Sequence, residues 1–163
     1  TLIHSINLVA PVAIVLGEEL QPAFAAIREQ ILQQPRPLAS LQHEVQEMRD
    51  KLRQHHGKES VDVKHQVGGI VDLEFISQYL VLGHAAEHAQ LYRYSDNIRI
   101  LDAAAASGLL PEQQVQQLQQ AYQLLRGAGH RQTLAPAKLP EQDSLTQAKQ
   151  VVEQSWRQLF SQS

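Results

Sequence analysis

The chain has 163 residues, of which 43% are apolar, so it is long enough to form one domain that buries about 70% of its unfolded surface. It contains no cysteine, which excludes disulfides and thiol chemistry and fits a cytoplasmic location. The formal net charge of -3 argues against nucleic acid as a partner, and no apolar run is long enough to span a membrane.

The N-terminal segment differs in composition from the rest of the chain. Residues 7–17, NLVAPVAIVLG, are β-branched and apolar, which is typical of a strand. The remainder indicates helices, so a strand here would have no partner. We therefore expect residues 1–17 to be the end of a preceding nucleotidyltransferase domain or a tail, and residues 18–163 to be a helical bundle domain. We accordingly expect the natural protein to begin before Thr1.

The first two predicted helices lie on either side of Pro35 and Pro37. One begins at Glu18 and ends before the prolines, and the other covers about Leu38 to His56. Both have apolar residues three or four positions apart, the spacing of a helix that packs along one face. These residues are Leu20, Phe24, Ile27 and Ile31 in the first helix and Leu41, Val45, Met48 and Leu52 in the second.

The next stretch is the most apolar part of the chain. Residues 61–64, VDVK, alternate like a short extended segment, and residues 68–82, GGIVDLEFISQYLVL, predict a helix that is apolar on almost every face. We expect this helix to run from about Gly69 to His88 at the centre of the fold. Asp72 lies on the side of Phe75.

A buried Asp72 needs a partner, because an unpaired buried charge costs several kcal/mol, on the order of a domain's whole stability. The expected partner is a bidentate guanidinium from Arg49, Arg53 or Arg99.

Three further helices complete the prediction. Ser95 and Asp96 are good N-cap residues for a short helix that Gly108 closes, and Pro111 begins a longer helix whose end near Gly127 and Gly129 is not fixed by the sequence. Their expected inward residues are Ile98, Leu101 and Ala105, and then Val115, Leu118, Tyr122 and Leu125.

A loop over residues 133–143 should precede the last helix, with Ser144 as its cap. The inward residues there are Leu145, Ala148, Val152, Trp156 and Leu159. The predicted fold is all-α, an up-and-down bundle of about five to six helices with a short extended N-terminal remnant.

His84, Glu87 and His88 form an H-x-x-E-H motif, the inverted zincin signature. A catalytic zinc needs a third protein ligand, and the sequence pattern indicates no residue for that position. We therefore expect an exposed helix end here, with a stand-alone zinc hydrolase as the competing hypothesis.

Lys64, Gly68 and Gly69 precede a helix, where free backbone N–H groups could hold a phosphate. Asp72 and Glu74 already place negative charge at this helix start, which favours an ordinary glycine turn. The two carboxylates lie two positions apart, so they point in nearly opposite directions and are poorly placed to share Mg²⁺.

Three sequence blocks carry a family resemblance. They are EVQEMRDKLRQH at 44–55, GGIVDLEFISQYLVL at 68–82 and YSDNIRIL at 94–101. With them, the chain from about Gly17 to its end, including Trp156, resembles the C-terminal half of bacterial glutamine synthetase adenylyltransferase/deadenylylase. This family is also called glutamate-ammonia-ligase adenylyltransferase.

The resemblance implies a parent enzyme that transfers AMP from ATP, with Mg²⁺, to a tyrosine of glutamine synthetase. It also implies regulation by glutamine and a PII-type signal protein. The family's catalytic site, a Gly-Ser turn followed by paired aspartates, lies on a nucleotidyltransferase domain, and no stretch of this chain has that pattern. We therefore expect the helical domain beside it, with no catalytic residue, no bound cofactor and no activity alone.

The candidate residues of this domain would contact substrate or support the fold. They are Lys64, Gly68, Gly69, Asp72, Glu74, Arg49, Arg53, Asp96 and Arg99. A non-catalytic docking module that binds glutamine synthetase or a PII-type protein is the alternative.

The chain also departs from the family pattern. Pro11 and Ala13 lie where the family has arginines, His84 and His88 form a pair that the family does not keep, and Gly127 and Gly129 interrupt a helix that is continuous in the family.

Overall fold

The computed structural model describes residues 20–56, 63–134 and 142–160. This part of the chain contains six α-helices, one short 3-10 helix and no strand, so the all-α prediction is confirmed. The helices are α2 (Gln21–Leu32), α3 (Leu38–His56), α4 (Ile70–His84), η1 (Ala89–Tyr92), α5 (Asn97–Ala106), α6 (Glu112–Leu134) and α7 (Gln142–Phe160). The predicted N-terminal strand lies outside the described residues.

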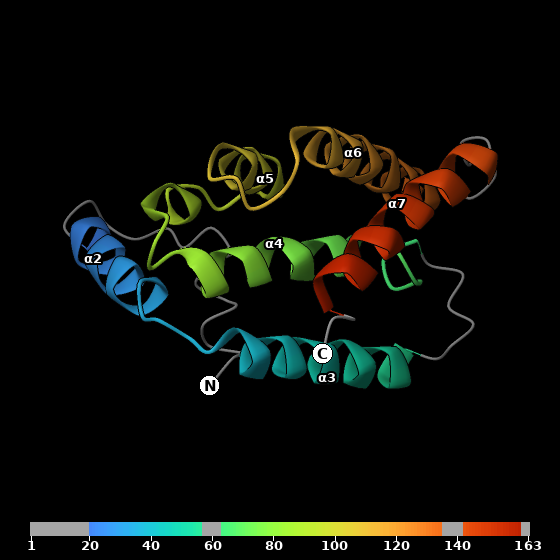
Figure 1. Cartoon of the computed structure of the whole chain (residues 1–163). Coiled ribbons are helices and arrows are strands. Elements are labelled where there is room, and N and C mark those ends of the chain that lie inside the picture. Colours follow the sequence, from blue (N-terminus) through green and yellow to red (C-terminus); the bar gives the residue numbers. More distant parts are fainter. Residues whose placement is uncertain (1–19, 57–62, 135–141, 161–163) are drawn as a thin grey trace.

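Helix α4 lies at the centre of the fold. Figure 1 shows it between α3 on one side and α5 and α6 on the other, with α7 crossing beside it. Leu73, Ile76 and Leu80 are at most 1% exposed, and residues on its other faces are also buried, as expected for an apolar helix wrapped by neighbours. Asp72 is buried among them.

Helix α3 has the predicted bounds, and the buried Leu41 and Val45 form its inward seam. Of the two predicted cap residues, Asp96 caps helix α5: its side chain accepts a hydrogen bond from the backbone N–H of Arg99 at 3.0 Å. It ends before Gly108, which has a φ of 71°.

Helix α6 continues through both of its glycines to Leu134. The predicted loop therefore begins later than expected, and the cap at Ser144 is wrong because α7 has already begun at Gln142. The predicted inward residues of both helices are buried except Leu159, which is only partly buried, and Phe160, at 1% exposure, lies in the core at the end of α7.

Two predictions around α4 need correction. The helix ends at His84 and not at His88, because the carbonyl of His84 accepts the N–H groups of both Glu87 and His88 in a closed turn. Of the predicted extended segment 61–64, the structure describes only Val63 and Lys64, and both lie in a turn.

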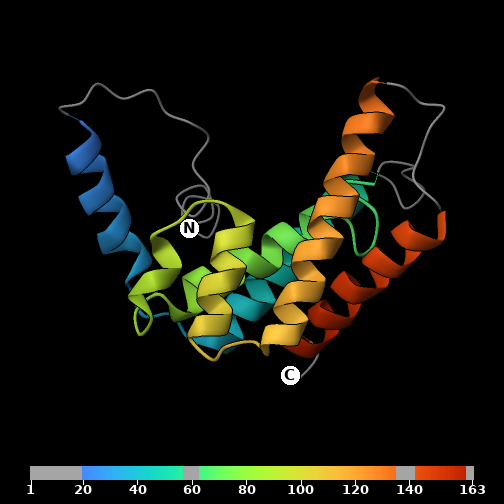
Figure 2. The same ribbon diagram turned by 90° about the horizontal axis from the view of Figure 1, so that it is seen from above.

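Helix α2 packs differently from its pattern. Leu20 and Ile27 are 58% and 54% exposed, whereas Phe24 and Ile31 are partly buried, so half of the predicted apolar stripe faces outward. The helix is held by Leu32, which is buried, and by polar contacts: Arg28 donates to the carbonyls of Tyr92 and, at 3.2 Å, Tyr94. Figure 2 shows α2 at the edge of the molecule opposite α6 and α7.

No helix within the described ranges is long and apolar enough to cross a membrane.

Candidate functional site

The Asp72 carboxylate is the centre of a buried polar network. Arg49 of α3 donates from Nε to Oδ1 at 2.7 Å and from Nη2 to Oδ2, which is the predicted bidentate geometry. Arg53, one turn further along α3, donates to Oδ2 at 3.0 Å, and the backbone N–H of Gly68 donates to the same oxygen at 2.8 Å. We call Arg49, Arg53, Gly68 and Asp72 the clamp.

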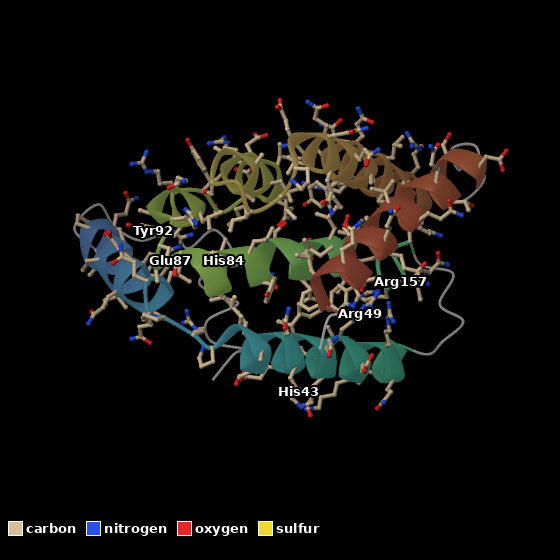
Figure 3. All side chains as sticks on the ribbon, in the orientation of Figure 1. His43, Arg49, His84, Glu87, Tyr92 and Arg157 are labelled. Atoms are coloured by element: carbon tan, nitrogen blue, oxygen red, sulfur yellow. The ribbon has the colours of Figure 1, made fainter. Side chains whose placement is uncertain are left out.

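The clamp is closed on its outer side by α7. The guanidinium of Arg49 lies over the ring of Trp156, 3.8 Å from the ring centroid. Trp156 stacks on Phe160, with centroids 4.2 Å apart, and meets the edge of Phe75 at 6.5 Å. Figure 3 shows Arg49 between α3 and α7. The positive charge of the guanidinium is therefore stabilised by a carboxylate on one side and by an aromatic face on the other, without water.

The turn at residues 63–69 fixes the start of α4 against α7. Gly68 has a φ of 71°, and a Cβ added there would lie 2.2 Å from the carbonyl oxygen of Lys149, so only glycine fits. The side chain of Lys149 in turn donates to the Gln66 amide oxygen. The glycine turn therefore carries a contact between two helices that are far apart in sequence.

Backbone donors at the start of α4 are used within the fold. Gly68 donates to Asp72, Gly69 donates to the Gln66 carbonyl at 2.9 Å, and Val71 donates to the Lys64 carbonyl at 3.1 Å. This arrangement favours the ordinary glycine turn over a phosphate cradle at these positions. The clamp is a structural unit that positions the turn and α4.

Asp72 and Glu74 point to different surroundings. Asp72 contacts the arginines of α3, whereas Glu74 is half-buried on the side of Lys64 and Arg126. Burial raises the pKa of Glu74, and the nearby charges of Lys64, Arg126 and His65 oppose that rise. The two carboxylates therefore face different partners, in keeping with their two-residue spacing on the helix.

Asp96 and Arg99 lie away from the clamp. They pair with each other at the start of α5, with Arg99 Nε 3.2 Å from Asp96 Oδ2, and both side chains are exposed. The Arg99 guanidinium also lies over the ring of Tyr94 at 5.2 Å. Of the three arginines proposed as partners of Asp72, the structure thus brings Arg49 and Arg53 to it and not Arg99.

The H-x-x-E-H residues lie at the end of α4 and in the turn that follows, near α2 and Tyr92 (Figure 3). His84 is half-buried against Tyr79, with ring centroids 6.2 Å apart. Burial lowers the pKa of His84, and His88 lowers it further. Within the described residues, no group of three or more His, Cys, Asp or Glu side chains could hold a metal ion.

Sequence reasoning missed the part that α7 plays in this site. It placed Trp156 in the core but did not connect it with Arg49, and it gave Lys149 and Gln66 no role. The signal available was that Trp156, the single tryptophan, lies on the same stripe as Val152 and Leu159. The spacing within one helix does not identify a partner on another.

Comparisons with known proteins agree with the sequence blocks. A family model described as GlnD PII-uridylyltransferase matches residues 36–155, which include the whole clamp. The bifunctional glutamine synthetase adenylyltransferase/adenylyl-removing enzyme of Mannheimia haemolytica is 38% identical over 149 residues. These cover 89% of this chain but 16% of that protein, so the chain spans about a sixth of that relative. The resemblance to such adenylyltransferases is confirmed, and the chain belongs to the family described as GlnD PII-uridylyltransferase.

Proposed function

We propose that the chain is the C-terminal helical domain of an enzyme that transfers AMP from ATP to a tyrosine of glutamine synthetase. The observation that carries this proposal is the 38% identity to a protein named as a glutamine synthetase adenylyltransferase. Catalysis, ATP and Mg²⁺ would belong to a nucleotidyltransferase domain that precedes these helices in the parent protein, in the cytoplasm.

The clamp supports a non-catalytic role for this domain. Its carboxylate accepts four hydrogen bonds from the fold itself, and its arginine is stacked on Trp156. A group so completely satisfied is poorly suited to proton transfer or metal binding, both of which need an open position. The clamp would thus support the fold of this domain, and the catalytic residues would lie on another domain.

The outward face of α2 suits the contact with the preceding domain. Leu20 and Ile27 are more than half exposed, and α2 is the first described helix after the N-terminal segment. Exposed apolar residues on one helix face are typical of a surface that another domain covers.

The test is a transfer assay with purified glutamine synthetase, Mg²⁺ and radiolabelled ATP. The 163-residue chain should transfer no AMP, and the longer natural protein should transfer it. Adenylylation by the chain alone would contradict the proposal. A longer protein that contains no Gly-Ser turn with paired aspartates, and transfers no AMP, would contradict it as well.

A second function, a docking module for glutamine synthetase or a PII-type protein, is favoured by the surface between α6 and α7. A groove of about 290 Å³ there is lined by Pro111, Gln113, Gln114, Gln117, Val151, Gln154, Ser155 and Gln158. Uncharged amides can pair with a partner's backbone, so the groove suits a protein ligand. Immobilised chain should retain one of the two purified proteins if this function is correct, and neither if it is wrong.

A further inference from the structure

A second pocket lies on the opposite side of α4 from the clamp. It has a volume of about 460 Å³, within the range of small-molecule sites. The turn before α4, the first turns of α4 and the C-terminal half of α6 form its walls, and these segments are neighbours in Figures 1 and 2. The lining residues are Lys64, Ile70, Glu74, Tyr122, Arg126, Gly129 and His130.

Cationic side chains dominate this pocket. Lys64 comes from the turn, and Arg126 and His130 come from successive turns of α6. The Arg126 guanidinium lies 5.6 Å from the centroid of the Tyr122 ring, which holds it beside the pocket. Glu74 is the single acidic residue among the lining residues, so the walls carry two fixed positive charges and a histidine against one carboxyl group.

Gly129 leaves the floor of the pocket open. A Cβ added there would meet only Ile70 Cδ1, at 3.7 Å, which is an ordinary contact. Crowding therefore does not require glycine at this position. Glycine inside a helix nevertheless costs about 1 kcal/mol relative to alanine. Gly129 lines the pocket, so a longer side chain at this position would fill part of the space that the pocket now offers.

We propose that this pocket binds a phosphorylated small molecule that carries hydroxyl groups. Its phosphate would lie between Arg126, Lys64 and His130, and a hydroxyl group would donate to Glu74. Phosphate fits better than a carboxylate, because its three terminal oxygens can accept hydrogen bonds from the guanidinium fork of Arg126 and from Lys64 at the same time. Because the Glu74 carboxylate accepts hydrogen bonds, the pocket should prefer a phosphate ester with hydroxyl groups over inorganic phosphate. The inference does not depend on the proposed adenylyltransferase function.

The probe is ribose 5-phosphate, with ribose and inorganic phosphate as comparisons, titrated into the ¹⁵N-labelled 163-residue chain. Ribose 5-phosphate should shift the amide signals of Lys64, Gly129 and His130, should bind more tightly than inorganic phosphate, and ribose should not bind. Absence of binding at about 10 mM, a concentration that would reveal even very weak sites, would overturn the proposal. Equal binding of inorganic phosphate would overturn it too, because Glu74 would then select nothing.

Two variants locate the ligand. Arg126→Gln should weaken binding at least about tenfold, the loss of a charge-assisted hydrogen bond. Gly129→Met should abolish binding by filling the floor while the melting temperature stays at or above that of the parent chain, since methionine is the better helix former. Gly127→Met is the matched control: it lies on the same helix, faces the flexible end of Arg131 and does not line the pocket. Unchanged affinity in Gly129→Met, or equal losses in both glycine variants, would place the ligand elsewhere.

Discussion

Replacing Asp72 by asparagine tests the clamp directly. The substitution keeps the size of the side chain but removes its charge and turns one acceptor into a donor. The side chains of Arg49 and Asp72 are 10% and 4% exposed, so water cannot take the place of the lost carboxylate. Arg49 would remain buried against Trp156 without a counter-ion, and the Gly68 N–H or a guanidinium N–H would face another donor.

Breaking one side of a buried ion pair costs about 3–5 kcal/mol. A domain of this size loses about 2–4 °C of melting temperature per kcal/mol, so Asp72→Asn should lower Tm by about 10 °C. The free energy of unfolding is best measured in urea, with the fluorescence of Trp156 and the helical circular dichroism as separate probes. Trp156 is the single tryptophan and stacks on Arg49, so its emission reports on the clamp itself.

Asp50→Asn is the matched control, because Asp50 is the exposed neighbour of Arg49 on α3 and loses the same charge. It should change the free energy of unfolding by less than about 0.5 kcal/mol. A loss below about 1 kcal/mol in Asp72→Asn would refute the reasoning, because such a value is typical of an exposed ion pair. An unchanged melt together with lost activity of the parent enzyme would show instead that Asp72 contacts substrate.

Three further predictions concern the turn and the titrating groups. In urea unfolding, Gly68→Ala should lower the free energy of unfolding by at least about 2 kcal/mol more than Gly108→Ala does. Both glycines have a φ of 71°, so the backbone strain of the substitution is the same. A Cβ on Gly68 would meet the backbone of α7, whereas a Cβ on Gly108 meets nothing within 4 Å. Equal losses of stability in the two variants would mean that the turn at Gly68 can move away from α7 at no cost, which would contradict this prediction. Burial lowers the pKa of His84 from 6.5, so the unfolded chain binds the proton more readily than the folded chain. Stability therefore falls as the pH drops below about 6.5. His84→Gln should reduce the difference in Tm between about pH 7.5 and pH 5.5. Burial raises the pKa of Glu74 above 4.5, so the folded chain binds the proton more readily than the unfolded chain. Stability therefore rises as the pH falls from the pKa of the folded state towards 4.5. Glu74→Gln should remove this rise and should not lower Tm at neutral pH.

Much of the fold follows from local pattern. The all-α class, the bounds of α3 and the central place of α4 follow from apolar spacing, because a helix without a polar stripe must be surrounded. The need of Asp72 for an arginine also follows, since a buried carboxylate requires a counter-charge. Which arginine it would be did not follow, because Arg49, Arg53 and Arg99 differ only in where the helices lie in space.

The errors have the same origin. The end of α4 at His84 depends on a closing turn, and the sequence has no proline or glycine between positions 84 and 107 to mark it. The outward stripe of α2 is indistinguishable from an inward one, because periodicity shows that a face is apolar and not what covers it. The pocket at Gly129 depends on the distance between α6 and the turn before α4, and the apolar pattern of one helix does not predict that distance.

The clamp has a consequence for the order in which the domain can form during synthesis. Arg49 and Asp72 leave the ribosome well before Trp156, which lies in α7 and covers the guanidinium of Arg49. Until α7 arrives, the arginine and the aromatic cluster around Phe75 lack their cover, and the turn at Gly68 lacks the backbone against which it rests. The core is therefore completed by contacts between segments about 100 residues apart, a slow step in folding. A nascent chain that pauses before residue 142 would expose the apolar face of α4, and this interval is when the domain depends most on protection from aggregation.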